Sequence, residues 1–121
     1  MAGVYNIAVG VTNHAVYVDN AGQLGMIPSS RRYKHDLADM GADSAAIYSL
    51  RPVTFAYNSD ASETKQYGLI AEEVDAVFPG IVVRNADGQP ETVQYHVLPA
   101  LLLNELKKLA ARVAVLENHL A

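Results

Sequence analysis

The chain has 121 residues, half of them apolar and 18% charged, which is the composition of a globular chain large enough for one domain with a modest core. Its net charge is -4 at pH 7. Because a protein that holds nucleic acid through its phosphates normally carries a surplus of basic residues, we expect no nucleic-acid partner.

The chain contains no cysteine, which excludes disulfides, thiolate catalysis and cysteine-based metal sites. Its four histidines are not spaced as metal ligands, so we expect no metal site and no cofactor; they are His14, His35, His96 and His119. No segment approaches the ~20 consecutive apolar residues that a membrane-spanning helix needs, and the first residues lack the pattern of a signal peptide. We therefore expect no membrane partner, and we expect the natural chain to extend further upstream.

The N-terminal segment is rich in valine, isoleucine and tyrosine. Residues 4–11 (VYNIAVGV) and 15–19 (AVYVD) predict two strands, and residues 20–22 (NAG) predict the turn that follows them. Two strands alone are marginal in water. We therefore expect this segment to pair with other chains or with a part of the chain further upstream.

Residues 30–50 predict a helix with a weak point at Gly41, because a glycine inside a helix is destabilising. The sequence Arg51-Pro52 ends this element, since the residue before a proline is disfavoured in the helical conformation. The helix prediction rests on five apolar residues at roughly helical spacing: Tyr33, Leu37, Met40, Ile47 and Leu50.

The middle of the chain predicts short alternating elements. Residues 53–57 and 66–70 predict strands on either side of a polar loop, and residues 71–78 predict a short helix that ends before Pro-Gly. Residues 81–84 and 92–95 predict a hairpin around an Asp-Gly turn. These elements predict a small mixed unit of the α+β class.

From His96 onward the chain predicts a long helix with a coiled-coil repeat, because its apolar residues alternate in steps of four and three over nearly three heptads. With Leu106 at heptad position a, Arg112 falls at g and Glu117 at the following e, where a parallel coiled coil would bring them together between neighbouring chains. The alternative is an amphipathic helix docked on its own monomer. We predict a parallel oligomer with an interface made by Leu102, Leu106, Leu109, Val113, Leu116 and Leu120.

Ser29 and Lys34 lie between the strand-rich segment and the α+β unit. A serine–lysine dyad needs a neutral lysine, and keeping an ordinary lysine neutral at pH 7 costs about 4.6 kcal/mol unless burial or nearby cations such as Arg31 and Arg32 contribute. Residues five apart lie ~16 Å apart in a strand and ~140° apart around a helix, so contact requires a bend or a lysine from a neighbouring chain. The alternative is that Ser29 or Ser30 caps the next helix.

Three carboxylates share the short predicted helix at residues 71–78. They are Glu72, Glu73 and Asp75, and no partner for acid–base chemistry is evident near them in the sequence. We interpret them as a solvated helix face.

Four motifs occur in order along residues 29–121: residues 29–37 (SSRRYKHDL), 50–57 (LRPVTFAY), 67–74 (YGLIAEEV) and 93–95 (VQY) followed by the leucine-rich helix. In this order they resemble the C-terminal intramolecular chaperone domain of phage tailspikes, tail fibres and endosialidases, the peptidase S74 family. One such motif is weak as a signal, whereas four in the right order are fairly specific.

The resemblance implies an α+β domain that forms a homotrimer through a parallel coiled coil and helps the upstream β-rich fibre or spike of its own chain to fold. It also implies a single self-cleavage, as by a serine endopeptidase, at the Pro28–Ser29 bond, with Ser29 as nucleophile and Lys34 as general base. The protein would then be found in a phage tail fibre or spike precursor, or in the cytoplasm of a bacterial host.

On this interpretation, residues 1–28 are the end of the β-rich passenger stalk, residues 29–96 form the chaperone unit and residues 97–121 form the coiled-coil helix. The sequence departs from the family pattern after the nucleophile, where the family usually has aspartate and this chain has Ser30. Two other functions remain open at this point. One is a permanent trimerisation clamp that never cleaves, and the other is a monomeric α+β binding module whose last helix docks on its own chain.

Overall fold

The computed structural model describes residues 8–120 of the chain. It divides into two compact units, residues 1–38 and residues 39–121. This division reflects packing and places residues 29–38 with the N-terminal unit. The predicted boundary at the Pro28–Ser29 bond is instead the bond at which self-cleavage is expected, and it stays a prediction.

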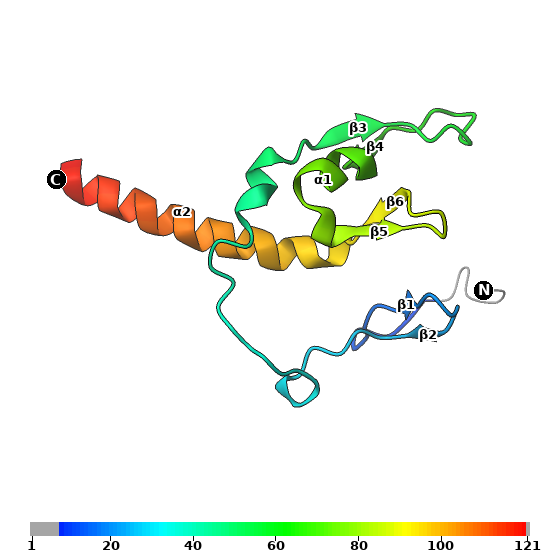
Figure 1. Cartoon of the computed structure of the whole chain (residues 1–121), viewed down its shortest axis with the longest axis horizontal. Helices are drawn as coiled ribbons and strands as arrows, with labels where there is room; N and C mark the ends of the chain where they lie inside the picture. The colour runs from blue at the N-terminus through cyan, green and yellow to red at the C-terminus, as the bar shows by residue number, and fades with distance from the viewer. Residues whose placement is uncertain (1–7, 121) are drawn as a thin grey trace. The chain divides into compact units, whose positions relative to one another are not determined.

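The first unit contains one small hairpin, in which β1 (Tyr17–Val18) pairs with β2 (Leu24–Gly25) in antiparallel fashion (Figure 1). The side chain of Asp19 stabilises the connecting turn by accepting two backbone hydrogen bonds of 2.9 Å. Gly22 has a φ angle of 81°, a left-handed conformation that glycine adopts without steric cost. The turn predicted at residues 20–22 is confirmed.

The two N-terminal strands differ from the prediction in extent and pairing. Within the strand predicted at residues 4–11, residues 4–7 lie outside the described part of the chain and residues 8–11 are irregular. Of the second predicted strand only Tyr17–Val18 is paired, and its partner is the β2 strand that follows the turn. The side chains of residues 8–38 are exposed, so nothing in the unit buries a face on which longer strands would depend.

The helix predicted at residues 30–50 is wrong. The segment contains two separate 3-10 turns, Arg31–Tyr33 and Ala45–Ser49, with irregular backbone between them. Asp36 and Gly41 have φ angles of 55° and 61°, and a continuous right-handed helix does not contain such left-handed residues. Three of the apolar residues that suggested the helix instead pack against the core of the second unit: Met40, Ile47 and Leu50.

The second unit confirms the predicted α+β class. It contains two antiparallel strand pairs and two helices, joined by short turns (Figure 1). The predicted strands, short helix, hairpin and long helix are all present, although several are shorter than predicted. In chain order they are β3 (Val53–Phe55), β4 (Gln66–Gly68), α1 (Ala71–Val77), β5 (Val82–Arg84), β6 (Pro90–Val93) and α2 (Leu98–Leu120).

The core of the second unit is small. Its buried apolar side chains are Val74 of α1, Ile81, Val93 of β6 and Leu101 of α2. Burial of each contributes roughly 1.5–3 kcal/mol to folding. Because Leu101 is the α2 residue in this group, the helix joins the core through its first turns, and residues 109–120 are exposed along the rest of its length (Figure 1).

The Tyr95 hydroxyl connects the β5–β6 hairpin to the β3–β4 pair, because Tyr95 follows β6 and Leu69 follows β4. It accepts a hydrogen bond of 3.0 Å from the Leu69 N–H and donates one of 3.2 Å to the Leu69 carbonyl. A Cβ atom added to Gly68 would lie 3.0 Å from the same hydroxyl, so glycine gives the tyrosine room to approach. This contact brings together two of the motifs seen in the sequence, YGLIAEEV and VQY.

A polar clamp, formed by Gly41, Ser44, Asn104, Glu105 and Lys108, ties the turn before Ala45–Ser49 to α2. The buried Ser44 hydroxyl donates to the Glu105 carboxylate, which is itself 6% exposed. The Asn104 amide donates to Ser44 Oγ at 2.7 Å and to the Gly41 carbonyl at 3.0 Å. Lys108 Nζ donates to the same carbonyl at 3.1 Å and lies 2.6 Å from Glu105. The Lys108 ammonium and the Ser44 hydroxyl hold the pKa of Glu105 below its ordinary value.

The Tyr95→Phe substitution should lower the free energy of unfolding by about 1 kcal/mol, because it leaves both backbone groups of Leu69 without their partner. Urea unfolding at one fixed protein concentration measures this loss. The matched control is Tyr57→Phe, which removes an exposed hydroxyl for which the described residues show no hydrogen bond. Equal stability of the two variants would contradict the role given to Tyr95.

The polar clamp predicts a pH dependence of stability. Since the folded pKa of Glu105 lies below its unfolded value, its contribution is fully present above the unfolded pKa, near 4.5, and is lost as the pH falls through the folded pKa. The free energy of unfolding should therefore fall less steeply below pH 4.5 in Glu105→Gln than in the parent chain. Glu72→Gln, which changes an exposed carboxylate of α1, should keep the parent slope. An unchanged slope in Glu105→Gln would refute the clamp as its source.

Candidate functional site

Ser29 and Lys34 are in contact within one chain. Lys34 Nζ donates a hydrogen bond of 3.3 Å to Ser29 Oγ. The 3-10 turn Arg31–Tyr33 makes this possible, because its backbone hydrogen bonds, each of 3.0 Å, fold the chain back between the two residues. The bend that the five-residue spacing required is therefore present.

Ser30 serves as the cap of this turn. Its Oγ accepts hydrogen bonds of 3.4 Å from the backbone N–H and from a guanidinium nitrogen of Arg32. The same guanidinium lies 4.7 Å from the centre of the Tyr33 ring, within the range of a cation–π contact. The capping alternative thus applies to Ser30, and the neighbouring Ser29 is left to contact Lys34.

The side chains of Ser29 and Lys34 are both exposed in the single chain. The site therefore offers a hydroxyl and an amine at hydrogen-bond distance, next to the Pro28 carbonyl in the sequence, but it does not exclude water. In such a pair a neutral amine can accept the hydroxyl proton, whereas an ammonium can only donate. An amine is favoured in its neutral form when it is removed from water, so the pair would have to be covered before it could act in this way.

Helix α2 has two apolar faces. Leu101 lies on the face that packs on the second unit and is 7% exposed. The predicted interface residues lie on another face and are between 44% and 88% exposed, so their own unit does not cover them. These residues are Leu102, Leu106, Leu109, Val113, Leu116 and Leu120.

Two of the three carboxylates of α1 form ion pairs. Arg51 holds Glu73 through two parallel hydrogen bonds of 3.0 and 2.6 Å, which lowers the pKa of Glu73 and raises that of the arginine. Asp75 pairs with Arg84 of β5. Glu72 and Glu73 are exposed, as predicted for a solvated face, whereas Asp75 is half-buried. The surface pair between Glu73 and Arg51 links the LRPVTFAY and YGLIAEEV motifs.

The polar clamp was not found by sequence reasoning. Ser44 and Glu105 stand 61 residues apart, and no short motif joins them. A signal was available in α2, where Asn104 and Glu105 interrupt the apolar residues near the start of the helix. Residues 98–103 ahead of them are apolar, and a polar side chain that is buried in such surroundings needs a hydrogen-bond partner.

A metal-binding cluster and a membrane-spanning helix are both absent from residues 8–120. No group of three or more histidine, aspartate or glutamate side chains in this range is placed to hold a metal ion. Among the helices described there, none is long and apolar enough to cross a membrane.

Comparison with known families supports the resemblance noted in the sequence. A family model for peptidase S74, described as the chaperone of endosialidase, matches residues 29–83. No curated protein matches the chain. The match begins at the proposed nucleophile, Ser29. It extends through strands β3 and β4 and helix α1 and ends within strand β5. Residues 29–83 of this chain are therefore similar to the peptidase S74 family of endosialidase chaperones.

Proposed function

We propose that this chain is a trimerising intramolecular chaperone that folds an upstream β-rich fibre or spike of its own chain and then releases itself by one cleavage at the Pro28–Ser29 bond. The observation that carries the proposal is the 3.3 Å contact between Lys34 Nζ and Ser29 Oγ. The setting that fits is a phage tail fibre or tailspike precursor, made in the cytoplasm of a bacterial host.

The proposed cleavage starts with attack of Ser29 Oγ on the carbonyl carbon of Pro28. Neutral Lys34 takes the hydroxyl proton and then delivers it to the backbone nitrogen of Ser29 as the C–N bond breaks. The product is an ester between Pro28 and Ser29 Oγ, and water hydrolyses it to the Pro28 carboxylate and the free hydroxyl. Because the nucleophile belongs to the residue just after the scissile bond, no separate substrate has to be bound.

The exposure of Ser29 and Lys34 supports control of this reaction by assembly. A solvated ammonium does not act as a base, and a single chain leaves Lys34 in water. Neighbouring chains that cover the dyad would favour the neutral amine, and cleavage would then follow trimer formation. This order suits a folding aid, because the passenger is complete before the aid is lost.

The exposed face of α2 supports the trimer. Its last turns, residues 109–120, are exposed, and an isolated helix of that length is marginal in water. Burial against two neighbouring chains supplies the apolar contacts that such a helix lacks. The heptad spacing makes a parallel coiled coil the arrangement that covers the face continuously.

A second candidate function is a trimerisation clamp that never cleaves. The exposure of the dyad and the use of Ser30 as a cap, at a position where the family usually has aspartate, favour this alternative. The two functions share the fold and the trimer and differ in whether the Pro28–Ser29 bond is broken.

Intact mass of the purified chain, beside Ser29→Ala and Lys34→Met variants made in the same way, tests the cleavage. We expect a fragment that begins at Ser29 in the parent and an uncut chain in both variants. Arg31→Met is the control for loss of a positive charge near the site and should still cleave. A parent that stays intact while forming a trimer would establish the clamp instead.

Light scattering tests the trimer. Leu109→Asp should convert it to smaller species, because the substitution places a charge at a buried position of the coiled coil. Val115→Asp changes another exposed apolar residue of α2, outside the heptad interface, and should leave the mass of the assembly unchanged. A parent chain that is monomeric in solution would refute the coiled coil and favour a monomeric binding module.

A further inference from the structure

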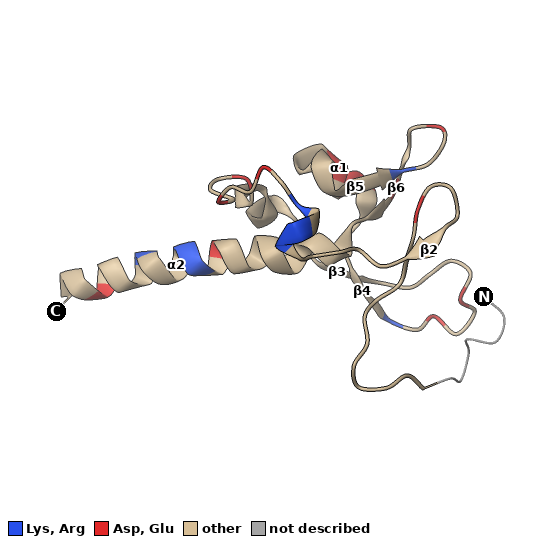
Figure 2. Cartoon of the chain, turned by 90° about the horizontal axis from the view of Figure 1, so that it is seen from below, with Lys and Arg blue, Asp and Glu red and all other residues tan. Residues whose placement is uncertain are grey.

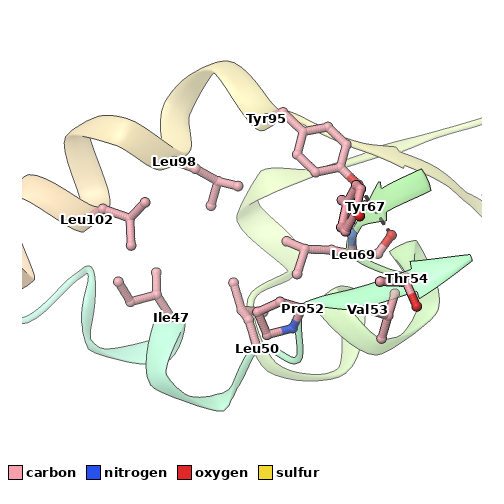
Figure 3. A pocket seen from close by; sticks show the side chains of 11 residues that line it. Ile47, Leu50, Pro52, Val53, Thr54, Tyr67, Leu69, Tyr95, Leu98 and Leu102 are labelled. Carbon is pink, nitrogen blue, oxygen red and sulfur yellow. Dashed lines mark hydrogen bonds between the residues drawn. The ribbon is translucent and has the colours of Figure 1, made fainter. Parts of the chain in front are cut away.

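The second unit contains an apolar groove of about 510 Å³ between the start of α2, the segment after the Ala45–Ser49 turn and β4 (Figure 3). Leu98 and Leu102 reach into it from α2, and Ile47 and Leu50 face them from the other side (Figure 3). No charged residue lines the groove. Since ligand sites combine apolar walls with polar groups that orient the ligand, this lining fits another protein side chain better than a small polar molecule.

The groove borders the predicted coiled-coil interface. Leu102 occupies heptad position d and Leu98 the preceding position g when Leu106 is placed at a. Position e after Leu102 is Leu103, which is 56% exposed and does not line the groove. In a parallel coiled coil, the g residue of one helix faces the e residue five positions later in its neighbour.

We propose that the groove is completed by a second copy of this chain, whose Leu103 packs against Leu98 at the groove edge. This inference rests on the proposed trimer and names a contact within it. It applies to Leu98 and Leu103 the same g-to-e relation that places Arg112 of one chain beside Glu117 of the next. In a three-fold assembly each chain offers its Leu103 to one neighbour and receives a Leu103 from the other.

The charge pattern of α2 supports this placement. The first turns of the helix, residues 98–104, carry no charged residue (Figure 2). A neighbouring helix can therefore approach the groove without burying an unpaired charge, which would be strongly unfavourable. The first charged residue, Glu105, is already paired with Lys108 in the polar clamp.

The contact between Leu98 and a neighbouring Leu103 would stabilise the fold of the second unit. The groove is lined by residues of the Ala45–Ser49 turn, β3, β4 and α2. The described core of this unit has only four buried apolar side chains. Apolar surface supplied by a neighbouring Leu103 adds to that small core. The second unit would therefore reach its full stability only in the assembled state.

The absence of cysteine allows a direct test by chemical cross-linking. Chains with Leu98→Cys and chains with Leu103→Cys, both carrying Ser29→Ala to keep them intact, are unfolded, mixed and refolded together. A short bis-maleimide should then link the two kinds of chain, and a mass tag on one of them identifies the mixed product. Each chain has a single cysteine, so every cross-link joins two chains.

The matched control replaces Leu103→Cys by Lys107→Cys, an exposed residue at heptad position b on the outer side of the helix. We expect at least a tenfold higher yield of mixed product with Leu103→Cys than with Lys107→Cys. Equal yields in a protein that light scattering shows to be trimeric would overturn the groove contact and leave the proposed function standing. A monomeric protein would overturn both.

A second pair of variants decides the matter if a cysteine variant does not assemble. Leu103→Asp should lower the urea midpoint of the parent assembly, whereas Val115→Asp, at an exposed site outside the interface, should leave it within experimental error. Equal midpoints in these two variants would count against a neighbour in the groove. A drop confined to Leu103→Asp supports it.

Discussion

Helix α2 carries two apolar faces, and the second unit covers only one of them. Leu101 and the polar clamp hold the first turns of the helix on that unit, so the helix cannot rotate to bury its other face. The heptad residues are left exposed along the rest of its 23-residue length. This exposed face supports the proposed assembly, in which the heptad spacing lets copies of the same helix cover it.

The proposed chemistry depends on a much smaller element. One 3-10 turn, Arg31–Tyr33, is enough to bring Lys34 to Ser29, and Ser30 caps that turn. The turn places the two groups in contact but leaves them in water. The contact between Ser29 and Lys34 is thus made by a local turn of the chain. The exclusion of water on which the proposed base catalysis depends is assigned to the proposed assembly.

A short tether joins these two features. The seven residues from Lys34 to Gly41 can span at most ~24 Å, and Gly41 is held on α2 by Asn104 and Lys108. Chain connectivity by itself therefore limits how far the dyad can lie from Gly41.

The family motifs serve mainly to hold the fold. The ion pair between Arg51 and Glu73 joins the second motif to the third, and the hydroxyl of Tyr95 joins the third to the fourth. Only the first motif carries the proposed nucleophile and base. This division explains how residues 29–83 can match the peptidase S74 model while cleavage is left to be tested by experiment.

Sequence patterns by themselves determined the elements whose signals are local: the strands and hairpin of the second unit, α1, the turn after β1 and the heptad helix. The five-residue spacing of Ser29 and Lys34 also showed that the chain must bend between them if they are to be in contact. Tertiary structure decided the rest. It replaced the helix at residues 30–50 by two short turns, because Asp36 and Gly41 adopt left-handed conformations and the apolar residues near them pack against the second unit. It also formed the polar clamp, since a hydrogen bond between residues 61 apart depends on packing that no local pattern encodes.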